Sequence, residues 1–212
     1  MKLVTEHSKP VWDIAVRLFH WSLVIVFIVA YLSGEDESEL HIYAGYVILG
    51  LVLFRIIWGF IGTKHAKFKD FIYSPSEIML HAKGLLSGKV KPYLGHNPLG
   101  GLMVMALLLT LMLTVVSGLK VYGAEGYGPL AKSDTSYFIS SANASNPEGM
   151  KDEDHEDSDA EEFWEEIHEF FANLMIFLIV FHILGVIISS KVENENLIKA
   201  MITGYKKNSD KQ

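Results

Sequence analysis

Residues 163–190 read FWEEIHEFFANLMIFLIVFHILGVIISS. The stretch is longer than the ~20 residues that cross a bilayer, and it carries no charged residue after Glu169. It contains two histidines, His168 and His182, 14 residues apart. In an α-helix this separation is about 21 Å of rise and about 1400° of rotation. Both rings therefore leave the same face of one helix, near opposite ends of the membrane.

Three further apolar blocks surround this one in the sequence. Of the 212 residues, 50% are hydrophobic and 20% are charged, which fits either a soluble domain or a small membrane bundle. The clustering decides, because apolar residues concentrate near residues 11–33, 40–60, 98–120 and 163–190. We predict an all-α, integral membrane four-helix bundle that forms a single domain over residues 1–212.

The first block is expected to remain in the protein as a helix. Pro10, Asp13, Arg17 and His20 interrupt its start, and no small-residue cleavage site follows Leu32, so a cleaved signal peptide is not indicated.

Charge sets the expected orientation. Lysine and arginine flank residues 11–33, fill residues 64–91 and follow residue 190, whereas residues 34–39 and 121–162 are acidic. The positive-inside rule then places both termini in the cytoplasm and the acidic loop, about 121–162, in the periplasm of a bacterial inner membrane. We expect lipid as a partner of the spans, and no nucleic acid.

Capping patterns predict shorter elements. Ser74-Pro75-Ser76-Glu77 is a capping box with proline at the first helical position, which predicts a short helix on the membrane surface. Asn97-Pro98 marks the start of the third long helix, and residues 197–205 read as another amphipathic segment. Ser158 is expected to cap the fourth helix, with most of residues 121–162 solvated and mobile.

Depth sorts the four intramembrane histidines into pairs. His20 lies nine residues after Val11 and His182 eight before Ser190, so both are about 12 to 14 Å deep from one side. His41 begins the second block and His168 lies five residues into the fourth, so both are near the other side. We therefore pair His20 with His182, and His41 with His168, each pair bridging two helices.

Two imidazoles between apolar walls suit the axial positions of a haem iron. The chain has no cysteine, and no carboxylate lies deep in the blocks to complete a zinc or copper site. The absence of cysteine also excludes disulfides, thiolate iron-sulfur clusters and covalent haem attachment. The residues thus favour noncovalent haem, with His20, His41, His168 and His182 as the iron ligands.

Five other residues are candidates for the haem sites. Gly45 and Gly185 lie about one turn from His41 and His182, where a flat macrocycle could approach the backbone, although glycines that merely let helices pack explain each about as well. Arg17 and Arg55 either snorkel to headgroups or neutralise the carboxylates of the inner haem. Lys120 is the matching candidate for the outer haem.

Two alternative roles suit the four histidines less well. A single intramembrane histidine is often a hydrogen-bonded core residue, but four at two matched depths fit this poorly, and a proton relay would need acidic residues deep in the spans. The remaining histidines lie in tails and loops and are expected to be solvated: His7, His65, His81, His96 and His155.

The pattern as a whole resembles a known family. The motifs are Val11-Trp12-Asp13 with Arg17, Phe19-His20-Trp21, His41 with Gly45-Tyr46, RIIWGF at residues 55–60, His96-Asn97-Pro98, and Glu195-Asn196-Leu197 with Thr203-Gly204. Together they resemble the bacterial cytochrome b561 family, which includes the cytochrome b subunits of nickel-iron hydrogenases. The resemblance covers nearly the whole chain except the acidic loop. It implies a four-helix membrane cytochrome with two haem b groups, whose ligands match His20, His41, His168 and His182.

The resemblance also implies respiratory electron transfer between the quinone pool, ubiquinone or menaquinone, and a periplasmic partner such as a c-type cytochrome or a hydrogenase-like protein. One alternative is a superoxide:quinone oxidoreductase, but Glu35, Asp36, Glu37, Glu39 and the acidic run 148–166 would repel superoxide and attract a basic partner. A second alternative is a non-redox bundle that binds a metal ion. The eukaryotic b561 reductases match less well, because they have six spans rather than four.

Overall fold

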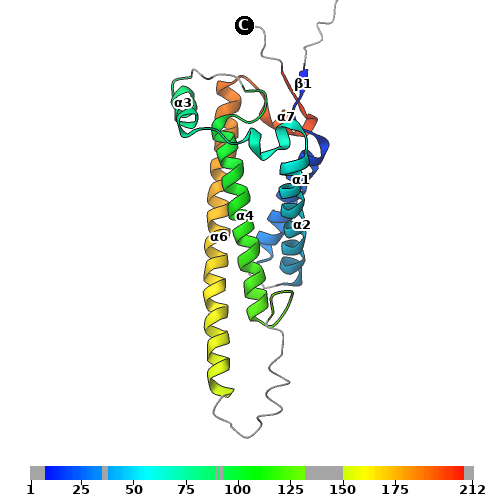
Figure 1. The fold of residues 1–212 in the computed structure, drawn as a ribbon, viewed down its shortest axis with the longest axis vertical. Helices are drawn as coiled ribbons and strands as arrows, with labels where there is room; N and C mark the ends of the chain where they lie inside the picture. The colour runs from blue at the N-terminus through cyan, green and yellow to red at the C-terminus, as the bar shows by residue number, and fades with distance from the viewer. Residues whose placement is uncertain (1–7, 35–37, 89, 91–92, 132–149, 208–212) are drawn as a thin grey trace, which may run out of the picture. The chain divides into compact units, whose positions relative to one another are not determined.

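The computed structural model of the protein describes residues 8–34, 38–88, 90, 93–131 and 150–207, and only the backbone of Ser8 and of 150–159. His7, the side chain of His155 and residues 132–149 of the acidic loop lie outside what is described. Four long helices are present: α1 (Ile14–Leu32), α2 (Glu39–Ile61), α4 (Pro98–Ala124) and α6 (Met150–Val192) (Figure 1). Each contains a stretch long and apolar enough to cross a membrane.

A polar side chain caps the start of α1, α2, α3 and α4. The Asp13 side chain accepts a hydrogen bond from Val16 N at 2.8 Å at the start of α1, and Ser38 caps α2 through His41 N. The predicted capping box of Ser74 and Glu77 begins α3 (Pro75–Leu86), as expected. Asn97 accepts from Gly100 N at 2.7 Å beside the start of α4. Each cap satisfies a backbone N–H that the first helical turn leaves unpaired.

The start of α6 differs from the prediction. Ser158 does not cap the helix, because α6 already begins at Met150 and Ser158 lies inside it. Residues 121–124 and 150–162 of the expected acidic loop are likewise helical. Glutamate and alanine are good helix formers, and acidic residues are favoured in the first turns of a helix, so the charged segment extends the apolar one.

The chain divides into two compact units. Unit 1 comprises residues 1–109 and 176–212, and unit 2 comprises residues 110–175. The expected single domain stays a prediction. In unit 1, α1 packs against α2 over a core that includes Val16, Phe19, Ala44, Ile48 and Val52.

Two short strands in unit 1 were not predicted. β1 (Ser8–Pro10) pairs antiparallel with β2 (Tyr205–Lys207), with Lys9 opposite Lys206. Between α7 (Leu197–Thr203) and β2, the Gly204 carbonyl accepts hydrogen bonds from Val11 N at 2.8 Å and Trp12 N at 3.1 Å. We call α7, Gly204 and β2 the C-terminal clasp, because together they hold the segment that leads into α1.

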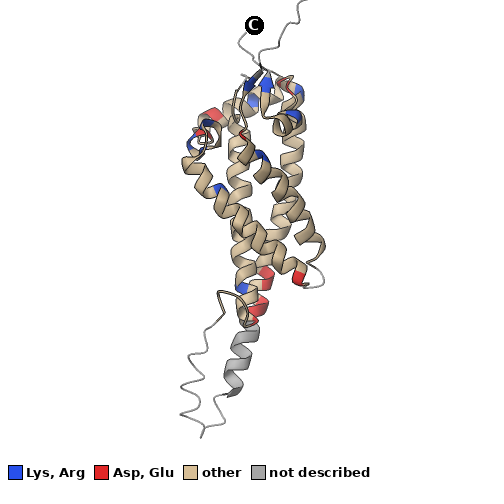
Figure 2. Ribbon diagram, turned by 90° about the vertical axis from the view of Figure 1, so that its right-hand side faces the viewer, with Lys and Arg blue, Asp and Glu red and all other residues tan. Residues whose placement is uncertain are grey.

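The segment between α2 and α4 carries the remaining elements of unit 1. After α2 come two short 3-10 turns, η1 (Lys64–Ala66) and η2 (Phe68–Asp70), and then α3. The segment packs closely, since a Cβ on Gly101 would lie 2.7 Å from the carbonyl oxygen of Phe71. Lysine and arginine gather at the end of unit 1 that holds the clasp and these turns (Figure 2).

Candidate functional site

His168 in unit 2 is anchored through Nδ1. Its Nδ1 lies 2.9 Å from the carbonyl oxygen of Thr114 on α4 and 3.2 Å from Ser117 Oγ. A carbonyl can only accept, so Nδ1 carries the proton and donates it. The lone pair is then on Nε2, and this is the form in which a neutral imidazole binds a metal with its other nitrogen anchored.

A glycine on α4 makes room for the His168 ring. A Cβ added at Gly118 would lie 2.9 Å from His168 Cε1 and 3.2 Å from Nδ1, closer than ordinary contact. Thr114, Ser117 and Gly118 thus form one surface of α4 on which the imidazole lies. These three residues were not predicted from the sequence; the available signal was two hydroxyls and a glycine within five positions of an otherwise apolar block.

His41 in unit 1 shows the same arrangement. It is the third residue of α2, and its Nδ1–H donates to the carbonyl oxygen of Ala30 on α1 at 2.8 Å. A Cβ on Gly34 would lie 3.4 Å from this Nδ1. Two of the four predicted ligands therefore have their Nδ1 anchored on a backbone carbonyl of a neighbouring helix.

His20 and His182, both in unit 1, are brought together. The two rings are close enough for a charge on one to act on the other. His20 Nδ1 is buried without a hydrogen-bond partner, and the ring meets the edge of Trp21 at 5.1 Å between centroids. A buried imidazole with no partner is unfavourable, and coordination of a metal would use its lone pair. The pairing of His41 with His168, which joins the two units, stays a prediction.

The two arginines do not behave alike. Arg55 is 3% exposed, so it does not snorkel to headgroups; its guanidinium carbon lies 5.2 Å and 5.3 Å from the ring centres of Phe68 and Phe71. Arg55 Nη1 is buried without a partner. Arg17 donates from Nη1 to the carbonyl of Ile202 in the clasp, while its Nε is buried without a partner.

The other candidates are compatible with a bulky cofactor. A Cβ at Gly45 or Gly185 would meet nothing within 4 Å. Lys120 is exposed in unit 2 and its ammonium lies 5.6 Å from the centre of the Trp164 ring. Whether these residues contact a haem stays a prediction.

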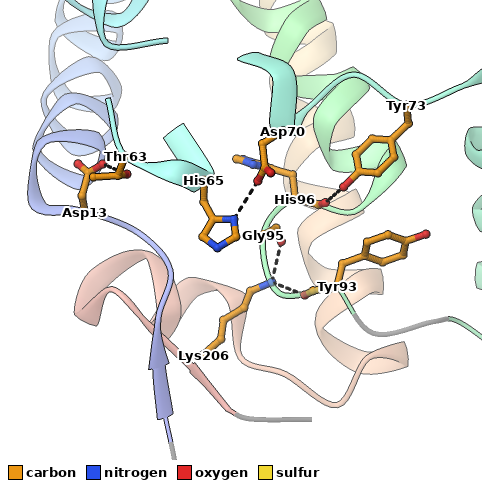
Figure 3. Close-up of polar contacts among 9 residues, drawn as sticks. All are labelled: Asp13, Thr63, His65, Asp70, Tyr73, Tyr93, Gly95, His96 and Lys206. Carbon is orange, nitrogen blue, oxygen red and sulfur yellow. Dashed lines mark hydrogen bonds and ion pairs between the residues drawn. The ribbon is translucent and has the colours of Figure 1, made fainter. Parts of the chain in front are cut away.

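Three of the loop histidines are not solvated, contrary to expectation. His65 Nδ1 is hydrogen-bonded to Asp70 Oδ2 at 2.8 Å (Figure 3). His81 is 5% exposed, and its ring is edge-on to Tyr93. The His96 ring lies 4.5 Å from Trp12 and 4.3 Å from Phe71 between ring centroids, and its Nδ1 is buried without a partner. These aromatic neighbours come from the segment that leads into α1 and from the segment after α2, so the burial could not be seen in the local sequence.

The donor set fits haem better than a closed metal site. Among the described residues, no group of three or more histidine or acidic side chains could hold a metal ion. Haem needs only two axial imidazoles, and its carboxylates need cationic or N–H donors such as the unpartnered Arg17 and Arg55 nitrogens. Anchored imidazoles in apolar helices together with a buried, unpaired arginine are features of a helical membrane cytochrome of the b type.

Comparison with known proteins specifies the class. The family model of the prokaryotic cytochrome b561 matches residues 11–204, and the chain belongs to this family of haem-binding membrane cytochromes. It is a bacterial membrane protein whose family implies haem b.

Individual relatives are more distant. The chain is 26% identical to the probable Ni/Fe-hydrogenase B-type cytochrome subunits of Rhizobium leguminosarum bv. viciae and Bradyrhizobium diazoefficiens, and 27% identical to that of Azotobacter vinelandii. The matches cover 60% of this chain and 62% to 64% of the relatives, so the chain spans less than two thirds of their length. No solved structure matches the chain.

Proposed function

We propose that this cytochrome is a di-haem electron conduit of the respiratory chain. His20 and His182 would hold an inner haem b, and His41 and His168 an outer one. The observation that carries the proposal is the anchoring of His41 and His168 by Nδ1 on the carbonyls of Ala30 and Thr114, since a ligand imidazole is oriented in this way. Each haem, when bound, would supply a one-electron carrier.

The side chains around the ligands would orient the imidazole rings and balance the charge of the haem carboxylates. Thr114 and Ser117 fix the His168 ring, and the exclusion of water by apolar helix faces would strengthen every charge interaction nearby. Arg17 and Arg55 would neutralise the carboxylates of the inner haem, and Lys120 those of the outer one. Gly45 and Gly185 would leave room for the macrocycle beside the backbone.

Electrons would pass between ubiquinone or menaquinone and a periplasmic protein, with both termini of the chain in the cytoplasm. Five exposed glutamates lie on the N-terminal part of α6: Glu161, Glu162, Glu165, Glu166 and Glu169. Their field would attract a basic face and repel the superoxide anion, which favours a c-type cytochrome or a hydrogenase-like partner over superoxide oxidation. The names of the relatives agree with a hydrogenase-like partner.

Haem stoichiometry and pairing test the proposal. The purified protein should contain two haems per chain by the pyridine haemochrome assay, and acid-acetone should extract both because no cysteine can bind them. Alanine at position 20 or 182 should remove one spectral component, and alanine at 41 or 168 the other. His81→Ala is the control, because this buried histidine is not a predicted ligand.

Two results would contradict the proposal. One haem or none per chain in the parent protein would exclude two sites. Loss of the same component in His168→Ala and His182→Ala would exclude the pairing by depth.

A further inference from the structure

Arg55 is a buried cation in need of an anion. A buried, unpaired charge is strongly unfavourable, and the faces of Phe68 and Phe71 offset only part of this. The charge of Asp13 acts on Arg55, but the carboxylates of Asp13 and Asp70 make their hydrogen bonds with other groups. Asp13 accepts hydrogen bonds from Val16 N, Trp58 Nε1 and Thr63 Oγ1, and Asp70 is bonded to His65. These contacts leave Nη1 of Arg55 unpartnered.

His96 is a second buried donor at the same place. Its ring and the Arg55 guanidinium both contact Phe71, with centres 4.3 Å and 5.3 Å from that ring. Burial, and then the cations Lys206 and Arg55, lower the pKa of His96 to about 3. At neutral pH the ring is therefore uncharged, with one N–H and one lone pair, and its Nδ1 has no partner.

The C-terminal clasp fixes His96 from outside. Lys206 is 5% exposed and donates to the carbonyls of Tyr93 at 3.4 Å and Gly95 at 3.2 Å, while Tyr73 Oη donates to the carbonyl of His96 at 2.7 Å (Figure 3). Gly95 has no room for a side chain, since a Cβ would lie 2.7 Å from His65 Nδ1. His96 is thus held in place by contacts that do not use its own ring nitrogens.

We propose that Arg55 Nη1 and the Nδ1–H of His96 together bind one carboxylate group of the haem that His20 and His182 hold. A carboxylate has two oxygens, one for each donor, and it supplies the charged acceptor that Arg55 Nη1 lacks. Arg55 and His182 are both among the groups of unit 1 whose charge acts on His96, so the predicted iron ligand lies within electrostatic range of this donor. This inference rests on the proposed function and adds His96 as a positioning residue for the inner haem.

The test compares two replacements of His96 in the full-length holoprotein. His96→Leu removes the N–H, whereas His96→Gln keeps an N–H donor of similar reach. Loss of the inner haem to an excess of apomyoglobin is followed in detergent. His96→Leu should lose this haem about ten- to a hundred-fold faster than the parent, as for one hydrogen bond to a charged group, and His96→Gln should stay close to the parent.

A second readout separates a direct contact from a general loss of packing. The haem carboxyl groups are labelled with ¹³C, and redox difference infrared spectra are recorded. The carboxylate bands of the labelled groups should be shifted in His96→Leu relative to the parent. His81→Leu, another buried histidine with an unpartnered nitrogen, should change neither the bands nor the rate of haem loss.

Parent-like haem loss and unshifted bands in His96→Leu would overturn the inference. It would equally be overturned if His96→Leu kept the haem but raised the KM for a short-chain quinol, because the donors would then serve a quinone carbonyl. If neither replacement assembles, the parent protein is loaded with iron protoporphyrin dimethyl ester, which has no free carboxylate. If the inner site retains this ester as well as it retains haem, the inference is overturned. Failure of the proposed function would appear separately, as a parent protein without two haems.

Discussion

Gly118→Ala should weaken binding of the outer haem without replacing a predicted iron ligand. The new methyl would lie 2.9 Å from Cε1 and 3.2 Å from Nδ1 of His168, so the ring must move by a few tenths of an ångström. The ring cannot yield freely, because its Nδ1–H is bound to Thr114 at 2.9 Å. Overpacking of this kind costs about 1 to 3 kcal/mol. A loss of about 2 kcal/mol at the ligand corresponds to roughly 30-fold weaker retention of the haem.

Optical redox titration and haem-loss kinetics measure this effect. The component that His168→Ala removes should be diminished or shifted in Gly118→Ala, and the other component should be unchanged. Gly50→Ala on α2 is the matched control, since a Cβ there meets nothing within 4 Å. If Gly118→Ala titrates like the parent and loses both haems at the parent rates, His168 does not hold an iron in the orientation described.

Three further outcomes are expected. Asp13→Ala should destabilise the protein by about 1 to 2 kcal/mol through loss of the α1 cap, measured by thermal unfolding in detergent at pH 7. Burial raises the pKa of Asp13, but hydrogen bonds from Thr63, Val16 and Trp58 outweigh this and hold the pKa below 3.8. The stabilisation is therefore present above pH 3.8 and is lost as the pH falls through the lowered pKa, so the difference between Asp13→Ala and the parent should shrink in acid, and Asp13→Asn, which keeps an oxygen cap, should lose less stability at pH 7. Gly204→Ala should loosen the clasp, because its φ is +87° and a Cβ would lie 2.7 Å from the Trp12 carbonyl oxygen; limited proteolysis should cut after residue 204 faster than in the parent, and an equal rate would contradict the contact. Replacing Glu161, Glu162, Glu165 and Glu166 with glutamine should slow electron transfer to a basic cytochrome at low salt and not at 1 M, where the Debye length is about 3 Å, with both haem spectra unchanged; equal rates at low salt would argue against steering.

The sequence was sufficient for elements with a strong local signal. The four long helices and α3 follow from apolar length and from caps such as Ser74 and Asn97, which act within three residues. The start of α6 was misplaced because Ser158 satisfies the same capping pattern inside a helix that glutamate and alanine continue. The pairing of β1 with β2 had no local signal, since each strand has three residues and its partner lies at the other end of the chain.

In the candidate site, too, only the residues with a local signal could be predicted from the sequence. Histidines in apolar segments stand out by themselves, so His20, His41, His168 and His182 could be named as candidate ligands, and their role stays a prediction. The residues that anchor them could not, because Thr114, Ser117 and Gly118 matter only once the face of α4 beside His168 is known. His96 looked like a solvated loop residue because its burial depends on Trp12, Phe71 and Lys206, which are distant in sequence.

The C-terminal clasp implies an order of events during biosynthesis. Lys206 and β2 follow all four spans in the chain, so the ribosome makes them after the helices that carry the predicted ligands. Until then the loop with Gly95 and His96 lacks the ammonium that binds its carbonyls, and β1 has no partner strand. The loop around His96 can therefore reach its final structure only after the fourth span has been made and β2 has paired with β1.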